Sequence, residues 1–171
     1  SMADVLVDSR ATLDEIVLPT QTAGIDVAPS TLELASTEVE LFTAIGREYA
    51  LREALSGWGQ QQYDYVLIDC PPTLGLLTVN ALVAATHLLI PIQSSYFALE
   101  GTDDLLETIE KVRQRPNPAL RILGVVITMH DKRTALGRDI REQIQKVFGD
   151  KVFRTVISKS VRLEESPAYK E

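Results

Sequence analysis

The chain has 171 residues, and with 45% hydrophobic residues it can bury one substantial core but is too short to suggest two. Its formal net charge of −7 argues against a protein that binds nucleic acid with its whole surface. The apolar stretches are too short to cross a bilayer and the first residues are unlike a secretory signal, so we expect one domain in the cytoplasm, without a membrane partner.

The first predicted elements are a short strand at residues 24–28 and a long helix after it. Apolar residues recur with helical spacing from Leu34 to Leu55, and Gly57 and Gly59 close the pattern. The period then changes at residues 65–68, a continuous apolar run that ends in Asp69. Such a run is typical of a strand buried on both faces of a parallel sheet.

Pro71 and Pro72 end this strand, and Thr73 is predicted to cap a helix over residues 74–85. Cys70, the only cysteine, is expected to be a small packed residue without a chemical role. Strands predicted at residues 87–92, 121–128 and 152–157 then alternate with helices. The helices are marked by two apolar stripes, Leu105, Leu106, Ile109 and Val112, and Leu136, Ile140, Ile144 and Val147.

This alternation predicts an α/β fold, with a doubly wound, mainly parallel sheet and helices on both faces. In such sheets ligands bind at the carboxyl ends of the strands. Asp69 follows a predicted strand directly, so its carboxylate is a candidate magnesium ligand in a nucleotide site. The alternative is an acid that caps a turn.

Charge is distributed unevenly along the chain. Residues 1–64 carry eleven acidic side chains and three arginines, a balance of −8 that is typical of a solvated face. Residues 131–162 carry nine basic and four acidic side chains, a balance of +5. This basic stretch either follows the phosphates of a nucleic acid or is only a solubilising surface. Tyr96 and Phe97 suggest either base stacking or packing, and packing is favoured.

Four separated segments of the chain resemble the ParA and Soj partition ATPases, P-loop proteins related to MinD and to the nitrogenase iron protein. They are DYVLIDCPPTLGLLTVNALVAAT, PIQSSYFALEGTDDLL, LGVVITMHDKRTALGRDI and VFRTVISKSVRLEESPAY, in this order along the chain. The resemblance covers essentially the whole chain. It implies a P-loop NTPase-like fold and, for the intact protein, the use of ATP and Mg²⁺.

The resemblance also assigns roles to single residues. Asp69 matches the Walker B aspartate, which orders Mg²⁺ through water. Pro71, Pro72, Thr73 and Gly75 match switch II, the segment that senses the γ-phosphate. The residues matching the strand end and the loop that approach the adenine are Thr128, Met129, Ile157, Ser158 and Val161.

Arg133 and Arg162 match basic residues with which family members bind DNA without sequence preference, and Lys159 is assigned to the same surface. The alternative is that the two arginines neutralise the neighbouring Asp131 and Glu165. The implied partners are nonspecific DNA, a ParB-type centromere-binding protein and a second copy in an ATP-bound homodimer. The implied location is the nucleoid in the cytoplasm.

The chain departs from the family pattern in one respect that concerns catalysis. Its 171 residues contain no GxxxxGK[ST] loop, which would cradle phosphates, and no match to the switch I aspartate. We therefore interpret residues 1–171 as a single partial ATPase domain, truncated at both ends relative to the family. We assign no catalytic residue, and expect these residues alone to bind no nucleotide and hydrolyse no ATP.

Two other functions remain open from the sequence. One is a MinD-like positioning ATPase, which uses a membrane or a protein as its matrix. The other is a non-catalytic truncated paralogue that acts as an interaction module.

Overall fold

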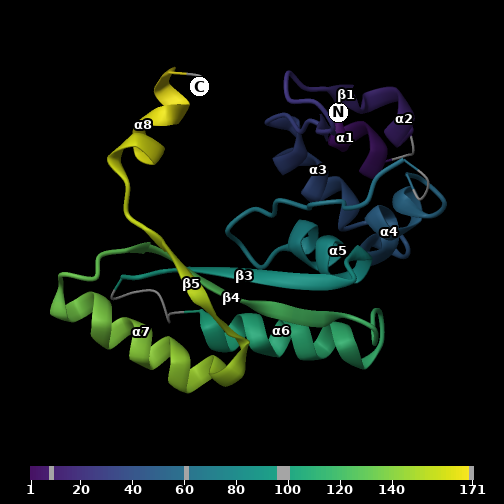
Figure 1. Ribbon diagram of the computed structural model, residues 1–171. Coiled ribbons are helices and arrows are strands. Elements are labelled where there is room, and N and C mark those ends of the chain that lie inside the picture. Colours follow the sequence, from purple (N-terminus) through teal and green to yellow (C-terminus); the bar gives the residue numbers. More distant parts are fainter. Residues whose placement is uncertain (8–9, 60–61, 96–100, 170–171) are drawn as a thin grey trace. The chain divides into compact units, whose positions relative to one another are not determined.

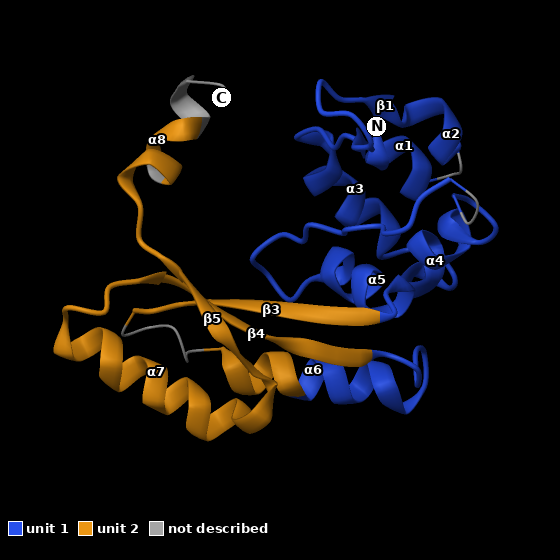
Figure 2. Cartoon of the chain, viewed as in Figure 1, with its two compact units in different colours: residues 1–86, 107–120 blue, residues 87–106, 121–171 orange. Residues whose placement is uncertain are grey.

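The computed structural model describes residues 1–7, 10–59, 62–95 and 101–169. The chain forms two compact units (Figure 2). Unit 1 comprises residues 1–86 and 107–120, and unit 2 comprises residues 87–106 and 121–171. Tyr96 and Phe97 lie outside the described residues, so their predicted packing stays a prediction.

Unit 1 is built mainly of short helices and a two-stranded antiparallel ribbon. The elements in chain order are α1 (Met2–Leu6), α2 (Leu13–Ile16), β1 (Leu18–Pro19), β2 (Asp26–Val27), α3 (Glu33–Leu41), the 3₁₀ helix η1 (Arg47–Tyr49), α4 (Ala50–Leu55) and α5 (Leu76–Ala84). One cluster of buried side chains joins four of the helices through Leu6, Leu41, Leu51 and Leu76. The unit therefore has a core of its own.

The long helix predicted after residue 28 is interrupted. Gly46 has a φ of 68°, a left-handed conformation that ends the helical path between α3 and η1. The strand predicted at residues 24–28 shortens to β2, which pairs with β1. The helix predicted over residues 74–85 is present as α5, but its N-cap is Gly75 and not Thr73.

The prediction of a strand over residues 65–68 is wrong. This segment has no regular secondary structure and forms no ladder with any strand in the described part of the chain. Without neighbouring strands most of its side chains are not covered: Tyr65 and Leu67 are 86% and 94% exposed, whereas Ile68 packs in part against the core cluster of unit 1. Cys70, expected to be packed, is also exposed.

Unit 2 contains the predicted parallel sheet (Figure 1). Its strands β3 (His87–Gln93), β4 (Arg121–His130) and β5 (Val152–Ser158) lie in the order β3-β4-β5, all parallel. The chain passes from β3 to β4 through α6 (Thr102–Gln114), of which residues 107–114 belong to unit 1, and from β4 to β5 through α7 (Ala135–Phe148) and the 3₁₀ helix η3 (Gly149–Lys151). Helix α8 (Val161–Tyr169) follows β5. The predicted α/β fold with a parallel sheet is confirmed.

The core of unit 2 lies along β4 and the inner face of α7. Val125 and Ile127 at the centre of β4 are fully buried, as is Ile144 of α7. Both ends of the predicted apolar stripe of α7, Leu136 and Val147, are half exposed, and Phe148 is buried in place of Val147. The burial of these side chains supplies the main driving force for this packing.

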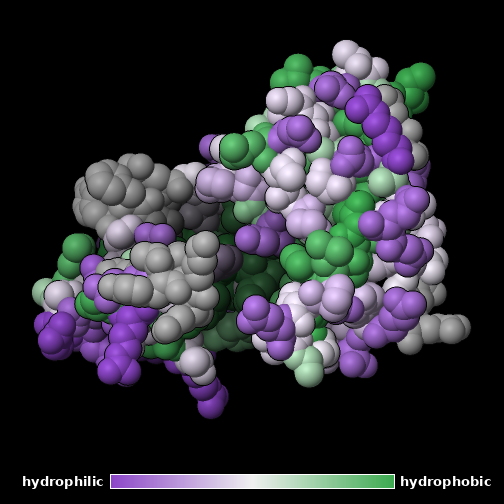
Figure 3. Space-filling view, turned by 90° about the horizontal axis from the view of Figure 1, so that it is seen from above, coloured by the Kyte–Doolittle hydropathy of each residue, from purple (hydrophilic) through white to green (hydrophobic). Residues whose placement is uncertain are grey.

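Several apolar residues of unit 1 are exposed. Leu32, Val39 and Ile45 are all more than two thirds exposed. Figure 3 shows such hydrophobic residues among hydrophilic ones on the face that it presents. None of the helices in the described part of the chain combines the length and the apolar character that a membrane span requires.

Candidate functional site

The three parallel strands of unit 2 end together at one edge of the sheet. Gln93 at the end of β3 is in register with Thr128, and His130 at the end of β4 is in register with Ser158 of β5. Two backbone hydrogen bonds continue the ladder beyond the strands. Ser94 N–H donates to the Thr128 carbonyl (2.9 Å), and Lys159 N–H donates to the His130 carbonyl (3.3 Å). These bonds fix the backbone of the loops that leave the sheet at its carboxyl edge.

Met129 marks the point where β4 leaves the regular strand conformation. Its φ is 51°, the only positive φ of a non-glycine residue among those described. A left-handed backbone is unfavourable for a residue with a Cβ, and such strain tends to be kept at functional sites. Met129 is 39% exposed, so its thioether side chain is partly available to a ligand.

The loop after β4 is fixed by a bond between neighbouring charged residues. The guanidinium of Arg133 donates from Nε and Nη2 to the two carboxylate oxygens of Asp131, both at 3.0 Å. The Arg133 backbone N–H also donates to Asp131 Oδ1 (3.0 Å). These bonds lower the pKa of Asp131 from its ordinary 3.8 to about 2, with the Arg133 side chain as the largest cause.

The start of α7 holds the same loop from the other side. The Thr134 hydroxyl accepts from the Gly137 N–H and donates to the Asp131 carbonyl, both at 3.1 Å. Thr134 is thus the N-cap of α7. A side chain at residue 137 would collide with the Asp131 carbonyl oxygen and the Thr134 hydroxyl. The close contact between the start of α7 and the loop after β4 therefore requires glycine at this position.

A buried histidine lies beneath this loop. His130 is 3% exposed, and its Nδ1 lies 3.1 Å from the hydroxyl of Ser94 at the end of β3. Sequence reasoning missed this pair because Ser94 and His130 are 36 residues apart. The register of two neighbouring parallel strands brings them together, and only the predicted order of the strands could have suggested it.

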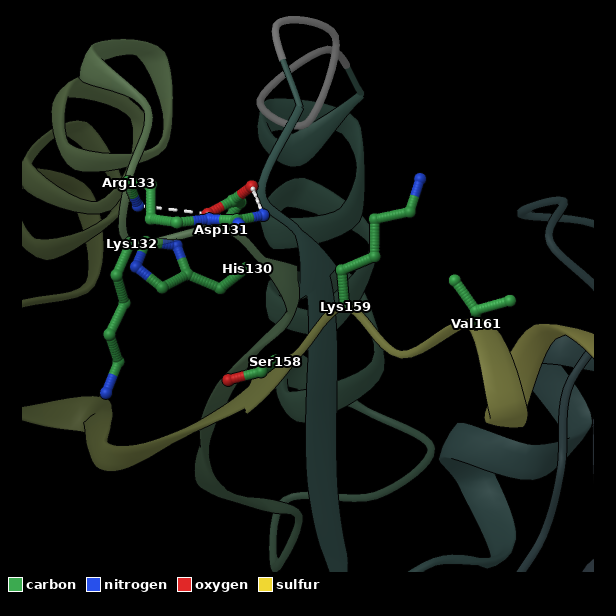
Figure 4. Close-up of a pocket in the computed structure, with 7 residues that line it drawn as sticks. All are labelled: His130, Asp131, Lys132, Arg133, Ser158, Lys159 and Val161. Atoms are coloured by element: carbon green, nitrogen blue, oxygen red, sulfur yellow. Dashed lines mark hydrogen bonds and ion pairs between the residues drawn. The ribbon is translucent and has the colours of Figure 1, made fainter.

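A cavity of about 440 Å³ opens at the ends of β4 and β5 (Figure 4). It is lined by His130, Asp131, Lys132, Arg133, Ser158, Lys159 and Val161. Three of these residues are basic and one is acidic, so the cavity attracts anions. Figure 4 shows Lys132 and Lys159 extending away from one another, while Arg133 lies alongside Asp131. The positive charge is therefore spread over the rim.

A second hollow, of about 270 Å³, shares Asp131 and Lys159 with the first. Its other lining residues are Gln93, Ser94, Ser95, Met129, Thr134, Leu136 and Gly137. Met129 and Leu136 give it an apolar part, and Gln93, Ser94 and Ser95 give it polar groups. An apolar surface with a few polar groups suits a planar heterocycle.

The structure brings most of the predicted site residues of unit 2 together. Arg133, Lys159, Ser158 and Val161 line the first cavity, and Met129 lines the second. Thr128 and Ile157 lie on β4 and β5 but line neither cavity. Arg162 is exposed on α8, outside both linings.

The remaining predicted residues belong to unit 1. Asp69, Pro71 and Pro72 are exposed in the irregular segment that leads to α5. Asp69 thus presents a solvated carboxylate and is not buried in the core. No group of three or more histidine, cysteine or acidic side chains suited to holding a metal ion occurs among the described residues.

The predicted site residues of the two units, each taken by itself, fit parts of a magnesium nucleotide. Magnesium usually keeps several waters and is held by one or two carboxylates and the phosphates of the substrate, so a single exposed Asp69 is compatible with it. In unit 2 the hollow beside Met129 fits a planar heterocycle. The 171 residues hold no Gly-rich lysine loop to cradle the phosphates, so we assign no hydrolytic step to them.

Comparisons with known proteins identify the relatives of this chain. A family model described as an AAA domain matches residues 1–122. The sporulation initiation inhibitor protein Soj of Bacillus subtilis is 47% identical over 166 residues, which are 97% of this chain and 65% of that protein. The chromosome partitioning protein ParA of Caulobacter vibrioides is 43% identical over 170 residues, 99% of this chain and 63% of that protein. The chain therefore spans less than two thirds of the length of these relatives.

Solved structures support the fold. Cobyrinic acid a,c-diamide synthase from Mycobacterium smegmatis, with bound ADP and magnesium, has a TM-score of 0.86 and 31% identity, covering 100% of this chain and 74% of that one. A putative plasmid partition protein from Borrelia burgdorferi bound to AMPPNP has a TM-score of 0.81, covering 99% of this chain and 64% of that one. The Borrelia burgdorferi protein is 22% identical to this chain, so its similarity supports the fold alone.

Proposed function

Since this chain belongs to the ParA/Soj family of partition ATPases, within the MinD/ParA superfamily, we propose that it is part of an ATP-dependent protein that segregates chromosomes or plasmids. In this proposal the ATP-bound protein forms a homodimer that binds DNA without sequence preference on the nucleoid, in the cytoplasm. A ParB-type centromere-binding protein stimulates its ATPase activity. The 171 residues taken alone do not hydrolyse ATP, because they hold no phosphate-binding loop.

The observation that carries the DNA-binding part is the basic rim of the first cavity. Residues 131–162 have a balance of +5 in a chain of net charge −7, and Lys132, Arg133 and Lys159 from this stretch line the cavity together. Clustered cations at one edge neutralise DNA phosphates and release counterions, whereas the acidic residues 1–64 repel them. We assign Arg133, Lys159 and Arg162 to this contact.

The ion pair with Asp131 does not prevent Arg133 from serving this role. The Arg133 side chain is 90% exposed, and an exposed ion pair contributes little to stability. Asp131 engages the N–H of Nε and one N–H of Nη2, which leaves both N–H groups of Nη1 and the second of Nη2 to donate to a phosphate. Asp131 then orients the arginine and partly offsets its positive charge without blocking it.

The nucleotide part of the proposal assigns separate tasks to the two units. In unit 1, Asp69 orders Mg²⁺ through water, and Pro71, Pro72, Thr73 and Gly75 respond to the γ-phosphate. In unit 2, Thr128, Met129, Ile157, Ser158 and Val161 contact the adenine. When bound, Mg²⁺ would neutralise charge on the phosphates. Ser158, Lys159 and Ser160 stand where the family commonly has Pro-Arg-Asn, so Lys159 supplies a charge without the planar fork of arginine.

The test is the double variant Arg133→Glu/Arg162→Glu in the complete encoded protein, with Mg²⁺ and an ATP analogue. DNA affinity should be lost while nucleotide affinity is kept. The matched control is Lys146→Glu/Arg154→Glu, which changes the charge of the same basic stretch equally, at two exposed residues that the proposal does not assign to DNA. If DNA affinity survives in the first variant, or falls equally in the control, the assigned DNA surface is wrong.

A further inference from the structure

Helix α5 begins without a cap of its own. Its N-cap is Gly75, which has no side chain, and its first turn contains no acidic residue. The first backbone N–H groups of a helix have no acceptor within the helix, so another group must satisfy them. The start of α5 matters because it directly follows Asp69 and residues 71–75.

Glu38 of α3 supplies the missing acceptor. The backbone N–H of Leu77, in the first turn of α5, donates to Glu38 Oε1 at 3.3 Å. The two residues are 39 positions apart in sequence, so this bond joins two separate helices of unit 1. A carboxylate at a helix N-terminus also interacts favourably with the helix dipole.

Gly75 makes room for this carboxylate. A Cβ at residue 75 would collide with Glu38 Oε1 and would lie 3.1 Å from the Glu38 carboxyl carbon. The φ of Gly75 is −82°, which any residue can adopt, so what glycine provides here is the space for the Glu38 carboxylate and not a special backbone conformation.

A second bond ties the preceding loop to the same helix. The hydroxyl of the buried Thr78 donates to the Thr73 carbonyl at 2.6 Å. Thr78 thus fixes the loop to α5, and Glu38 fixes the start of α5 to α3. Leu41 of α3 and Leu76 of α5 pack in one hydrophobic cluster, which holds the two helices in contact.

We propose that Glu38 is a positioning residue. Its carboxylate occupies the space left by Gly75, accepts the Leu77 N–H at the start of α5, and thereby sets the conformation of residues 71–75. The capping of α5 by Glu38 does not depend on the proposed function. Only its effect on nucleotide binding rests on that function, in which residues 71–75 respond to the nucleotide. Loss of the carboxylate leaves the start of α5 free to fray. The segment that follows Asp69 then populates its binding-competent conformation less often.

The test measures amide hydrogen exchange of Leu77 in the complete encoded protein. Glu38→Ala should raise the exchange rate about tenfold, the ratio that corresponds to the loss of a helix cap. Glu38→Gln, which keeps an oxygen acceptor, should raise it less. Glu40→Ala on the same helix is the matched control and should leave Leu77 unchanged, since the side chain of Glu40 is exposed.

A double-mutant cycle separates this role from a merely structural one. Gly75→Ala should expel the Glu38 side chain and match the effect of Glu38→Ala, whereas the double variant should be no worse than either single one. The proposal is overturned if Leu77 exchange is unchanged in Glu38→Ala, or if the two effects add.

The same variants report on the nucleotide. In Glu38→Ala the Kd for an ATP analogue with Mg²⁺ should rise, because a smaller fraction of the molecules keeps the competent loop. Unchanged affinity beside faster Leu77 exchange would overturn the positioning role in binding. A wild-type protein that binds no nucleotide would instead refute the proposed function, and Leu77 exchange would still decide whether Glu38 caps α5.

Discussion

Asp131 and Arg133 bind each other through three hydrogen bonds of 3.0 Å, two from the guanidinium and one from the backbone N–H of the arginine. The pair lies on the loop between β4 and α7, at the rim of the basic cavity. It fixes the direction of an exposed cation that the proposed function assigns to DNA. The strength of this pair can be measured without DNA or nucleotide.

The first prediction concerns the titration of Asp131. Its pKa is lowered to about 2 because Arg133 stabilises the ionised carboxylate. The pair therefore contributes to stability above pH 3.8, and this contribution is lost as the pH falls through about 2. Carboxyl carbon NMR should show a midpoint near 2, and Arg133→Ala should move it towards 3.8. An equal midpoint in both proteins would show that the arginine is not the cause.

The second prediction concerns Gly137 in the first turn of α7. Glycine to alanine inside a helix usually stabilises by about 0.5–1 kcal/mol. Here the new Cβ would collide with the Asp131 carbonyl oxygen and the Thr134 hydroxyl, so Gly137→Ala should destabilise the protein by about 1–3 kcal/mol. Denaturant unfolding measures the sign directly. Gln143→Ala, at an exposed position of the same helix, is the control, and a stabilised Gly137→Ala would contradict the loop geometry.

The third prediction concerns the buried amide of Asn80 in α5. Its Oδ1 accepts from the Leu51 N–H (3.1 Å), and its Nδ2 donates to the carbonyls of Arg47 (2.8 Å) and Leu76 (3.0 Å). Asn80→Ala leaves these buried groups unpaired, so the free energy of unfolding should fall by about 1–3 kcal/mol.

Chemical denaturation of Asn80→Ala tests this, with the exposed Ser36→Ala on α3 as its control. Equal stability of the two variants would mean that the Asn80 hydrogen bonds contribute nothing net.

The sequence predicted the elements whose apolar pattern is satisfied within unit 2. The strands β3, β4 and β5 and the helix α7 follow their predicted ranges closely, because each combines a regular apolar period with a clear end. The run at residues 65–68 has an equally strong pattern but no neighbouring strand among the described residues. A pattern predicts which side chains need covering, but it does not tell whether a covering partner is present.

Site residues can be predicted from the sequence where they lie within one short motif. Contacts between residues that are far apart in the sequence cannot. The family motifs point to Arg133, Lys159 and Ser158, and these residues do line one cavity. The contacts Ser94–His130 and Glu38–Leu77 join residues 36 and 39 positions apart, and no local spacing indicates them. The register of β3 and β4 produces the first, and the packing of α3 on α5 produces the second.

The proposed DNA surface can be tested through the salt dependence of DNA affinity for two variants of the complete ATP-bound protein. Each phosphate contact contributes about 0.9 to the slope of log K against log salt concentration. Arg133→Ala should lower the slope by about one and weaken binding equally for all sequences, whereas Asp131→Asn, which frees the guanidinium, should strengthen binding. Wild-type slope and affinity in both variants would contradict the claim that this edge of the sheet binds DNA.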